Sequence, residues 1–355
     1  MREKTRSTIW AIVCAVVLLA GEVAGFFFAW QIGVGVALTQ ALAFLLGFIL
    51  APIVHELGHI IMAKRQDMQV VYAKFSFLKI YDKNGKNRLG FASPFAMDET
   101  QVIPKMGGDM QKRASRYTLG GLIFGGVYFA ILILVSVLLT LLGLFYPAFA
   151  FWGLTVYAGY LFLLNVLPLT YNLGKTDMAV YLGIKKGEPA EKTLLSAMEI
   201  QGNLYAGKSY GEIDESLYFN LPQLAEDEPL FVVILDLRYR YWLDKGEFKK
   251  ASDCLNRLAQ AGEYLTADEE EKISAEFVYM HALNGDREKA EACSKGCAEY
   301  LQGETATAKR ILTAVAILGG KTDSAQVLKE QAKPLLEREK VAGNRKFEES
   351  LLARL

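Results

Sequence analysis

The sequence contains few histidines, prolines and cysteines, and it has no excess of either charge. Its 355 residues include 3 histidines, 9 prolines and 4 cysteines, and 39 basic side chains balance 39 acidic ones. The lack of a basic surplus argues against a nucleic-acid-binding protein. Charged residues make up only 22% of the chain and hydrophobic residues 52%. This composition excludes a disordered protein and is too apolar for an ordinary soluble one.

The four cysteines form no CxxC motif. Cys293 and Cys297 lie four residues apart in a helical pattern, so they share one face, as a metal or redox pair requires. The simpler interpretation is that these two, together with Cys14 and Cys254, are small buried apolar residues in a reducing compartment.

Charge and hydropathy divide the chain into two halves. Residues 1–184 contain 15 basic and 9 acidic side chains, whereas residues 185–355 contain 24 and 30. An apolar, basic half followed by a polar, acidic half predicts a transmembrane domain over 1–184 and a cytoplasmic domain over 185–355. The first half has four apolar stretches that are long enough to cross about 30 Å of hydrocarbon as helices. They cover about residues 9–30, 34–63, 117–145 and 148–167.

Basic residues are concentrated in alternate connections between these stretches. The N-terminus and the segment 64–116 are rich in lysine and arginine, whereas residues 31–33 and the turn around Tyr146 and Pro147 have neither. The first stretch is too long for a signal peptide, and we interpret it as an uncleaved span. We therefore expect a multi-pass protein of the cell membrane with both termini and the segment 64–116 in the cytoplasm.

Part of the basic segment has the pattern of a β-hairpin. Residues 70–81 and 88–95 are strand-like, and Asn84-Gly85 between them is a dipeptide typical of hairpin turns. We expect this hairpin at the membrane surface or dipping into it. An ordinary solvated hairpin is the alternative.

The acidic half contains a weak repeat in which a glycine between two helix-like stretches precedes an alanine. Successive copies are 39 and 35 residues apart, a spacing that suits stacked helical hairpins of the tetratricopeptide kind. The predicted fold is therefore mostly α: a polytopic membrane bundle with a small β-hairpin or sheet, followed by a soluble helical-hairpin repeat domain. The repeated pairs are Gly246 with Ala251, Gly285 with Ala290, and Gly320 with Ala325.

Two of the three histidines belong to one motif, His55-Glu56-Leu57-Gly58-His59, near the end of the second apolar stretch. Residues four apart share one face of a helix, so both imidazoles can bind one zinc ion. Glu56 then lies in the same turn, where it can accept a proton from water. Histidine and glutamate are costly in a membrane unless they are paired or bound to metal. The third histidine, His281, is expected to be an ordinary surface or packed residue.

A catalytic zinc site also needs a third protein ligand and an open position. Asp177 is the one acidic residue between Asp109 and Glu188, and it follows the fourth apolar stretch. The charge pattern places it at the same membrane face as the histidine motif. The alternative is that Asp177 caps the helix that begins there. Glu22, the remaining charge inside a span, is interpreted as structural, with a water path or gate as the alternative.

Together these elements resemble the site-2 protease family of intramembrane zinc metalloproteases. The matching features are an HExxH motif in an early transmembrane helix, then, after two further spans, Asn165-Val166-Leu167-Pro168, and then Asp177. The resemblance covers about residues 30–182. It departs from the family in a longer gap before the aspartate and in Met178, which stands where the family usually has glycine. Asn172 is a weaker alternative for the third ligand.

The resemblance implies an intramembrane zinc metalloendopeptidase that cleaves transmembrane segments of proteins or peptides. It implies that His55, His59 and Asp177 bind Zn²⁺ and that Glu56 is the general base for zinc-activated water. It further implies that Asn165 orients the substrate or stabilises the oxyanion.

Two further elements match the family by position. The glycine-rich residues 120–126 are similar to a small-residue stretch that permits close helix packing. The hairpin at 70–95 lies where such enzymes pair with an unwound substrate helix.

Two other functions stay open. One is a catalytically inactive membrane scaffold that recruits a cytoplasmic protein partner through its helical repeats. The intact motif argues against it, because a decayed site would have lost Glu56 first. The other is a zinc-dependent membrane enzyme that acts on something other than a peptide bond.

Overall fold

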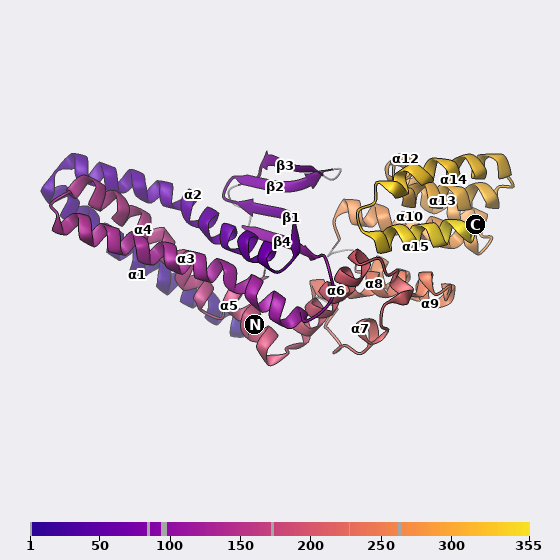
Figure 1. Ribbon diagram of the computed structural model, residues 1–355, viewed down its shortest axis with the longest axis horizontal. Helices are drawn as coiled ribbons and strands as arrows, with labels where there is room; N and C mark the ends of the chain where they lie inside the picture. The colour runs from indigo at the N-terminus through magenta and orange to yellow at the C-terminus, as the bar shows by residue number, and fades with distance from the viewer. Residues whose placement is uncertain (1, 84–85, 94–97, 172–173, 227, 262–264) are drawn as a thin grey trace. The chain divides into compact units, whose positions relative to one another are not determined.

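The computed structural model describes residues 2–83, 86–93, 98–171, 174–226, 228–261 and 265–355. It is mostly helical with a small sheet, which confirms the predicted fold class (Figure 1). Contacts divide the chain into two compact units. We call them the membrane unit, Met1–Ile103 with Asp109–Glu188, and the helical-repeat unit, Pro104–Gly108 with Pro189–Leu355. The boundary predicted at 184 falls inside a helix of the membrane unit.

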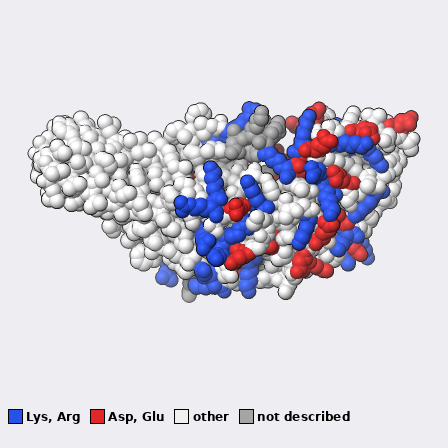
Figure 2. All heavy atoms as spheres, in the orientation of Figure 1, with Lys and Arg blue, Asp and Glu red and all other residues white. Residues whose placement is uncertain are grey.

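Four helices of the membrane unit are long and apolar enough to cross a membrane. Figure 2 shows that most of their surface on the displayed face is free of charged side chains, as contact with lipid requires. They are α1 (Arg2–Ile32), α2 (Val34–Arg65), α3 (Met110–Leu141) and α4 (Phe145–Val166).

Several helix boundaries differ from the ends of the expected apolar stretches. Helix α3 begins seven residues earlier than expected, because the Asp109 side chain accepts a hydrogen bond from the amide of Lys112 and caps it. The turn between α3 and α4 lies at residues 142–144, before Tyr146 and Pro147, which belong to the first turn of α4. A proline is tolerated there because the amides of a first helical turn have no partner within the helix.

The expected hairpin is part of a four-stranded sheet. The prediction of one strand over 70–81 was wrong: the chain reverses at Ser76, whose φ of 55° takes it out of the extended conformation. Strands β1 and β2, like β2 and β3, are antiparallel, and the strand order is β3-β2-β1-β4. Asn84-Gly85 and residues 94–97 lie outside the described part of the chain. The strands are β1 (Met68–Phe75), β2 (Leu78–Lys83), β3 (Lys86–Phe91) and β4 (Glu99–Pro104), of which β4 was not predicted.

A short connection leads from α4 to the last helix of the membrane unit. It contains the paired strands β5 (Thr170–Tyr171) and β6 (Gly174–Lys175), and it runs into α5 (Asp177–Lys186). Helix α5 ends at Gly187, whose φ of 68° is the left-handed conformation that glycine adopts at helix C-termini.

The helical-repeat unit consists of packed helices of 17 residues or fewer around a main hydrophobic core, with a smaller cluster of Ala332, Leu336 and Leu352. The longer ones are α6 (Pro189–Tyr205), α8 (Pro229–Asp244), α9 (Phe248–Gln260), α10 (Ala267–Leu283), α11 (Arg287–Ser294), α13 (Ala306–Leu318), α14 (Thr322–Glu337) and α15 (Ala342–Ala353). The shorter ones are η1 (Tyr210–Glu212), α7 (Ser216–Phe219), η3 (Lys295–Cys297) and α12 (Ala298–Gln302).

The three repeated glycines form three turns of the same geometry. Gly246, Gly285 and Gly320 have φ values of 75°, 77° and 70°. In each turn the residue after the glycine donates its amide to a carbonyl five residues earlier, the signature of a Schellman motif. The alanines five residues after these glycines are all buried, so the weak sequence repeat corresponds to a repeated helical hairpin.

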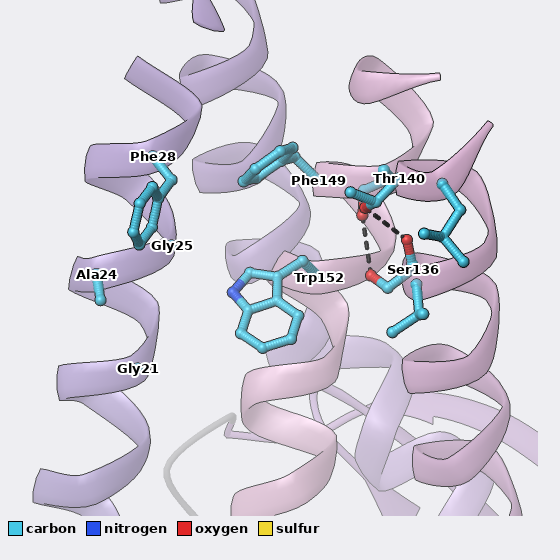
Figure 3. A pocket seen from close by; sticks show the side chains of 11 residues that line it. Gly21, Ala24, Gly25, Phe28, Ser136, Thr140, Phe149 and Trp152 are labelled. Atoms are coloured by element: carbon cyan, nitrogen blue, oxygen red, sulfur yellow. Dashed lines mark hydrogen bonds between the residues drawn. The ribbon is translucent and has the colours of Figure 1, made fainter. Parts of the chain in front are cut away.

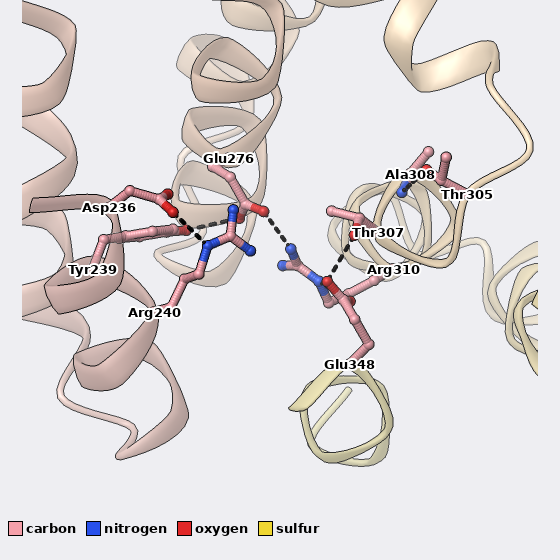
Figure 4. Close-up of polar contacts among 9 residues, drawn as sticks. All are labelled: Asp236, Tyr239, Arg240, Glu276, Thr305, Thr307, Ala308, Arg310 and Glu348. Atoms are coloured by element: carbon pink, nitrogen blue, oxygen red, sulfur yellow. Dashed lines mark hydrogen bonds and ion pairs between the residues drawn. The ribbon is translucent and has the colours of Figure 1, made fainter. Parts of the chain in front are cut away.

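A charged network lies in the core of the helical-repeat unit (Figure 4). Arg310 of α13 is fully buried, and it donates hydrogen bonds to Glu276 of α10 at 2.6 Å and Glu348 of α15 at 2.8 Å. Glu276 also accepts a hydrogen bond of 2.7 Å from Tyr239 of α8. Despite its burial, the two neighbouring carboxylates raise the pKa of Arg310 well above its usual value. The guanidinium thus stays charged and joins three helices of the core, while Tyr239 adds a fourth.

We predict that Arg310→Met destabilises the helical-repeat unit by about 3–5 kcal/mol, because it leaves two buried carboxylates without their cation. Lys333→Met is the matched control: Lys333 pairs with Glu330 on the surface, and its loss should cost less than about 1 kcal/mol. Hydrogen exchange of α10 and α13 in the full-length protein measures both effects. Equal protection in the two variants would contradict the proposed role of the buried arginine.

Candidate metal centre

Helix α2 places His55 and His59 on one face, one turn apart. Both side chains are buried, and their Nε2 atoms lie 3.3 Å from each other. The i, i+4 spacing of the motif therefore has the consequence that the sequence predicted. Pro52, three residues earlier, lies inside the same helix and lacks the amide that would bond to the preceding turn.

Asp177 joins the two histidines from the start of α5. Its Oδ2 atom lies 3.2 Å from Nε2 of His55 and 3.2 Å from Nε2 of His59. Thr176 fixes this position: its hydroxyl donates to the carbonyl of Leu167 and accepts from the amide of Leu169, which closes the connection after α4. Thr176, and not Asp177, is the N-cap residue of α5, and the described contacts give Asp177 no capping bond. Asn172 lies outside the described residues.

The three side chains direct Nε2 of His55, Nε2 of His59 and Oδ2 of Asp177 at one point. Nδ1 of His59 lies 3.1 Å from the carbonyl oxygen of Tyr117, which can only accept, so Nδ1 carries the proton. Oδ2 of Asp177 is buried and has no well-aligned donor in the described structure. Burial raises the pKa of Asp177, but the neighbouring imidazoles outweigh this and lower it, so the carboxylate is anionic at neutral pH.

The donor atoms fit a tetrahedral zinc ion. Zinc binds imidazole nitrogen and carboxylate oxygen at about 2.0–2.1 Å, so ligand atoms at two corners of a tetrahedron are roughly 3.3–3.4 Å apart. The three separations of 3.2, 3.2 and 3.3 Å agree with this value. Three protein ligands leave one corner for water or substrate, the arrangement of catalytic zinc sites.

Glycines of α3 make room for the cluster. A Cβ atom at Gly121 would lie 2.4 Å from Nε2 of His59 and 2.6 Å from Nε2 of His55. Next to Gly121, Gly120 packs against Gly58 of α2, and the two helices are in backbone contact there. A Cβ at either glycine would lie within 2.5 Å of the carbonyl oxygen of the other. The glycine-rich stretch thus permits the close helix packing that the sequence suggested.

Glu56 is buried beside the cluster and is held by a residue that the sequence did not single out. Its Oε2 atom accepts a 2.6 Å hydrogen bond from the hydroxyl of Thr100 on β4. The Tyr117 hydroxyl of α3 in turn donates to the carbonyl of Thr100. Because the Tyr117 carbonyl accepts from His59, one chain of contacts links His59 to Glu56 through two other elements. No sequence signal marks Thr100, because its role arises only when β4 meets α2.

Asn165 is near the end of α4, and its carboxamide donates to the carbonyl of Leu161 in the same helix at 3.1 Å. The described contacts do not join it to the metal cluster. Its assignment to substrate orientation or to the oxyanion stays a prediction.

Glu22 is also buried, but in another part of the bundle. Its Oε2 atom has no hydrogen-bond partner in the described structure, and its backbone carbonyl accepts from the Gln40 side chain at 3.3 Å. Nearby, α1, α3 and α4 line an open apolar pocket of about 460 Å³ (Figure 3). The hydroxyls of Ser136 and Thr140 in its wall are bonded to backbone carbonyls. This pocket is lined by Gly21, Ala24, Gly25, Phe28, Ser136, Val137, Thr140, Leu141, Ala148, Phe149 and Trp152, and by none of the cluster residues.

Among the described residues, the other histidines, cysteines, aspartates and glutamates form no second cluster that could hold a metal ion. Cys297 is buried, its thiol contacts the carbonyl of Cys293, and burial raises its pKa to about 11. A thiol that stays protonated is a poor metal ligand. His281 stacks on Phe277, with 6.2 Å between the ring centres.

The chain matches no protein-family model, no curated protein and no solved structure. The assignment of the site therefore depends on its geometry and on the sequence motif.

We predict that Asp177→Asn lowers zinc affinity by about 100-fold or more, since it removes the anionic ligand while keeping the shape of the side chain. Elemental analysis and chelator competition on the purified full-length protein measure this. Asp109→Asn removes a carboxylate that caps α3 and should leave zinc binding unchanged. Full zinc stoichiometry and affinity in Asp177→Asn would remove Asp177 from the ligand set.

We predict that Gly121→Ala weakens zinc binding by about 10- to 100-fold, because the added methyl group displaces both imidazoles. Gly21→Ala is the matched control in another membrane helix, where a Cβ would meet nothing within 4 Å. Chelator competition compares the two. If both variants bind zinc as the wild type does, the two imidazoles do not form the site.

Proposed function

We propose that the protein is an intramembrane zinc metalloendopeptidase of the site-2 protease type. The observation that carries the proposal is the convergence of His55, His59 and Asp177 to 3.2–3.3 Å, with Glu56 buried beside them. The location of the cluster near the end of the apolar helix α2 supports cleavage of segments within or close to the membrane. This is also the function that the resemblance of residues 30–182 implies.

The residues of the site divide the work of peptide hydrolysis. His55, His59 and Asp177 would hold a zinc ion, which would supply Lewis acidity and so lower the pKa of a water molecule toward neutrality. Glu56 accepts the proton of that water and passes it to the leaving amine. Tyr117 fixes the ring of His59 through its carbonyl, as the outer partners of metal-bound histidines do.

The substrate must be extended at the site, because an intact helix uses its own carbonyls for internal hydrogen bonds. The sheet has β3 and β4 at its edges, and β4 carries Thr100, which contacts Glu56. We infer that a substrate segment lies along an edge of this sheet while its scissile bond meets the site.

The alternation of basic and uncharged connections supports a multi-pass arrangement in the cell membrane with cytoplasmic termini. The metal cluster then lies toward the cytoplasmic ends of α2 and α4. We propose that the substrate is a transmembrane protein or peptide, and that the helical-repeat unit binds a cytoplasmic protein partner, as stacked helical hairpins commonly do.

We predict that Glu56→Gln lowers the cleavage rate by about 10²- to 10⁴-fold while zinc content stays at the wild-type level. The assay reconstitutes the full-length protein with a library of single-span peptides and identifies products by mass spectrometry. Glu22→Gln is the control, because it also removes a buried carboxylate of the membrane helices but contacts no residue of the cluster.

Each other outcome selects a different function. Equal cleavage by wild type and Glu56→Gln would exclude Glu56 as the base. Absence of cleavage by both, together with capture of a cytoplasmic protein through residues 185–355, would support the scaffold in place of the protease.

A further inference from the structure

The five residues Pro104–Gly108, which we call the connector, run from the last residue of β4 toward α3, but they belong to the helical-repeat unit. The amide of Gly108 donates to both carboxylate oxygens of Glu199, at 2.9 and 3.1 Å. A Cβ at Gly202 would lie 2.5 Å from the carbonyl carbon and oxygen of Met106. The backbone of the connector is therefore in direct contact with α6.

Glycine occupies two further places where the connector meets α6. A Cβ at Gly107 would lie 2.5 Å from Oε1 of Glu199. Gly108 has a φ of 107°, a conformation that other residues rarely adopt. These contacts and the backbone conformation of Gly108 fit the connector closely to α6.

Both ends of the connector lead to residues that hold the candidate site. On one side, Thr100 lies four residues before Pro104, in a strand, and donates to Glu56 at 2.6 Å. On the other side, α3 carries Tyr117, which donates to the Thr100 carbonyl and accepts from His59. A strand and a helix are stiff over these lengths, so a shift of the connector moves the groups that hold Glu56.

We propose that Thr100 is a positioning residue for Glu56 and that the helical-repeat unit, through Glu199 and the connector, keeps Thr100 in place. The proposal rests on the proposed function for its catalytic readout. In this proposal the helical-repeat unit controls the position of Glu56, the general base. A partner that binds this unit and alters α6 then changes the rate of catalysis.

Hydrogen exchange tests the mechanical part of the proposal without any substrate. In the full-length protein, Glu199→Gln and Gly202→Ala should increase exchange several-fold in the connector, in β4 and in the first turns of α3. Gly296→Ala is the matched control in the same unit, where a Cβ would meet nothing within 4 Å. Increased exchange confined to the connector and α6 would overturn the proposal. Glu199→Gln keeps the size of the side chain, so an effect shared by both variants does not come from a general loss of packing in Gly202→Ala.

Kinetics on a cleaved single-span peptide test the positioning role. Thr100→Val should lower kcat by about 10- to 100-fold with KM changed less than twofold, and Thr100→Ser, which keeps the hydroxyl, should restore most of kcat. Glu199→Gln should lower kcat in the same way. The double variant Thr100→Val with Glu199→Gln should be no slower than Thr100→Val alone, because both act on one contact.

The outcomes separate this proposal from the proposed function. If Thr100→Val keeps the wild-type kcat, or if Thr100→Ser is as slow as Thr100→Val, the hydroxyl does not position Glu56. Additive effects in the double variant would place Glu199 outside this pathway. If the wild type cleaves no peptide, the proposed function fails, while the exchange experiment still decides whether the connector links α6 to β4.

Discussion

Two imidazole nitrogens and a carboxylate oxygen that face one another inside a helical bundle need a proton or a metal ion between them. Nε2 of His55, Nε2 of His59 and Oδ2 of Asp177 are within 3.3 Å of each other and largely withdrawn from solvent. A divalent metal ion would be bound by all three atoms at once, and this is the requirement on which the proposed function rests.

The packing around the cluster follows from the same requirement. The imidazoles fit because α3 has glycine where a methyl group would collide with both rings. The Tyr117 carbonyl fixes the orientation of His59, and Thr176 fixes the turn that presents Asp177. These contacts come from α2, α3 and the connection after α4. The site therefore depends on the whole membrane unit and not on the HExxH motif alone.

The sequence predicted the features that depend on local pattern. Long apolar stretches gave the four spans, the i, i+4 spacing gave the shared face of His55 and His59, and regularly spaced glycines gave the hairpin turns. Features that depend on long-range contacts were missed. The reversal at Ser76 has no turn residue to announce it, β4 is too polar to stand out, and Thr100 acquires its role only beside Glu56. Asp177 is far from the HExxH motif in sequence, but it could be singled out because it is the one acidic residue between Asp109 and Glu188.

X-ray absorption at the zinc edge, on full-length protein purified in detergent, tests the central claim most directly. The geometry predicts one zinc per chain in a shell of nitrogen and oxygen atoms at about 2.0–2.1 Å, with scattering from two imidazole rings. Protein without zinc, or zinc with sulfur neighbours at about 2.3 Å, would contradict it.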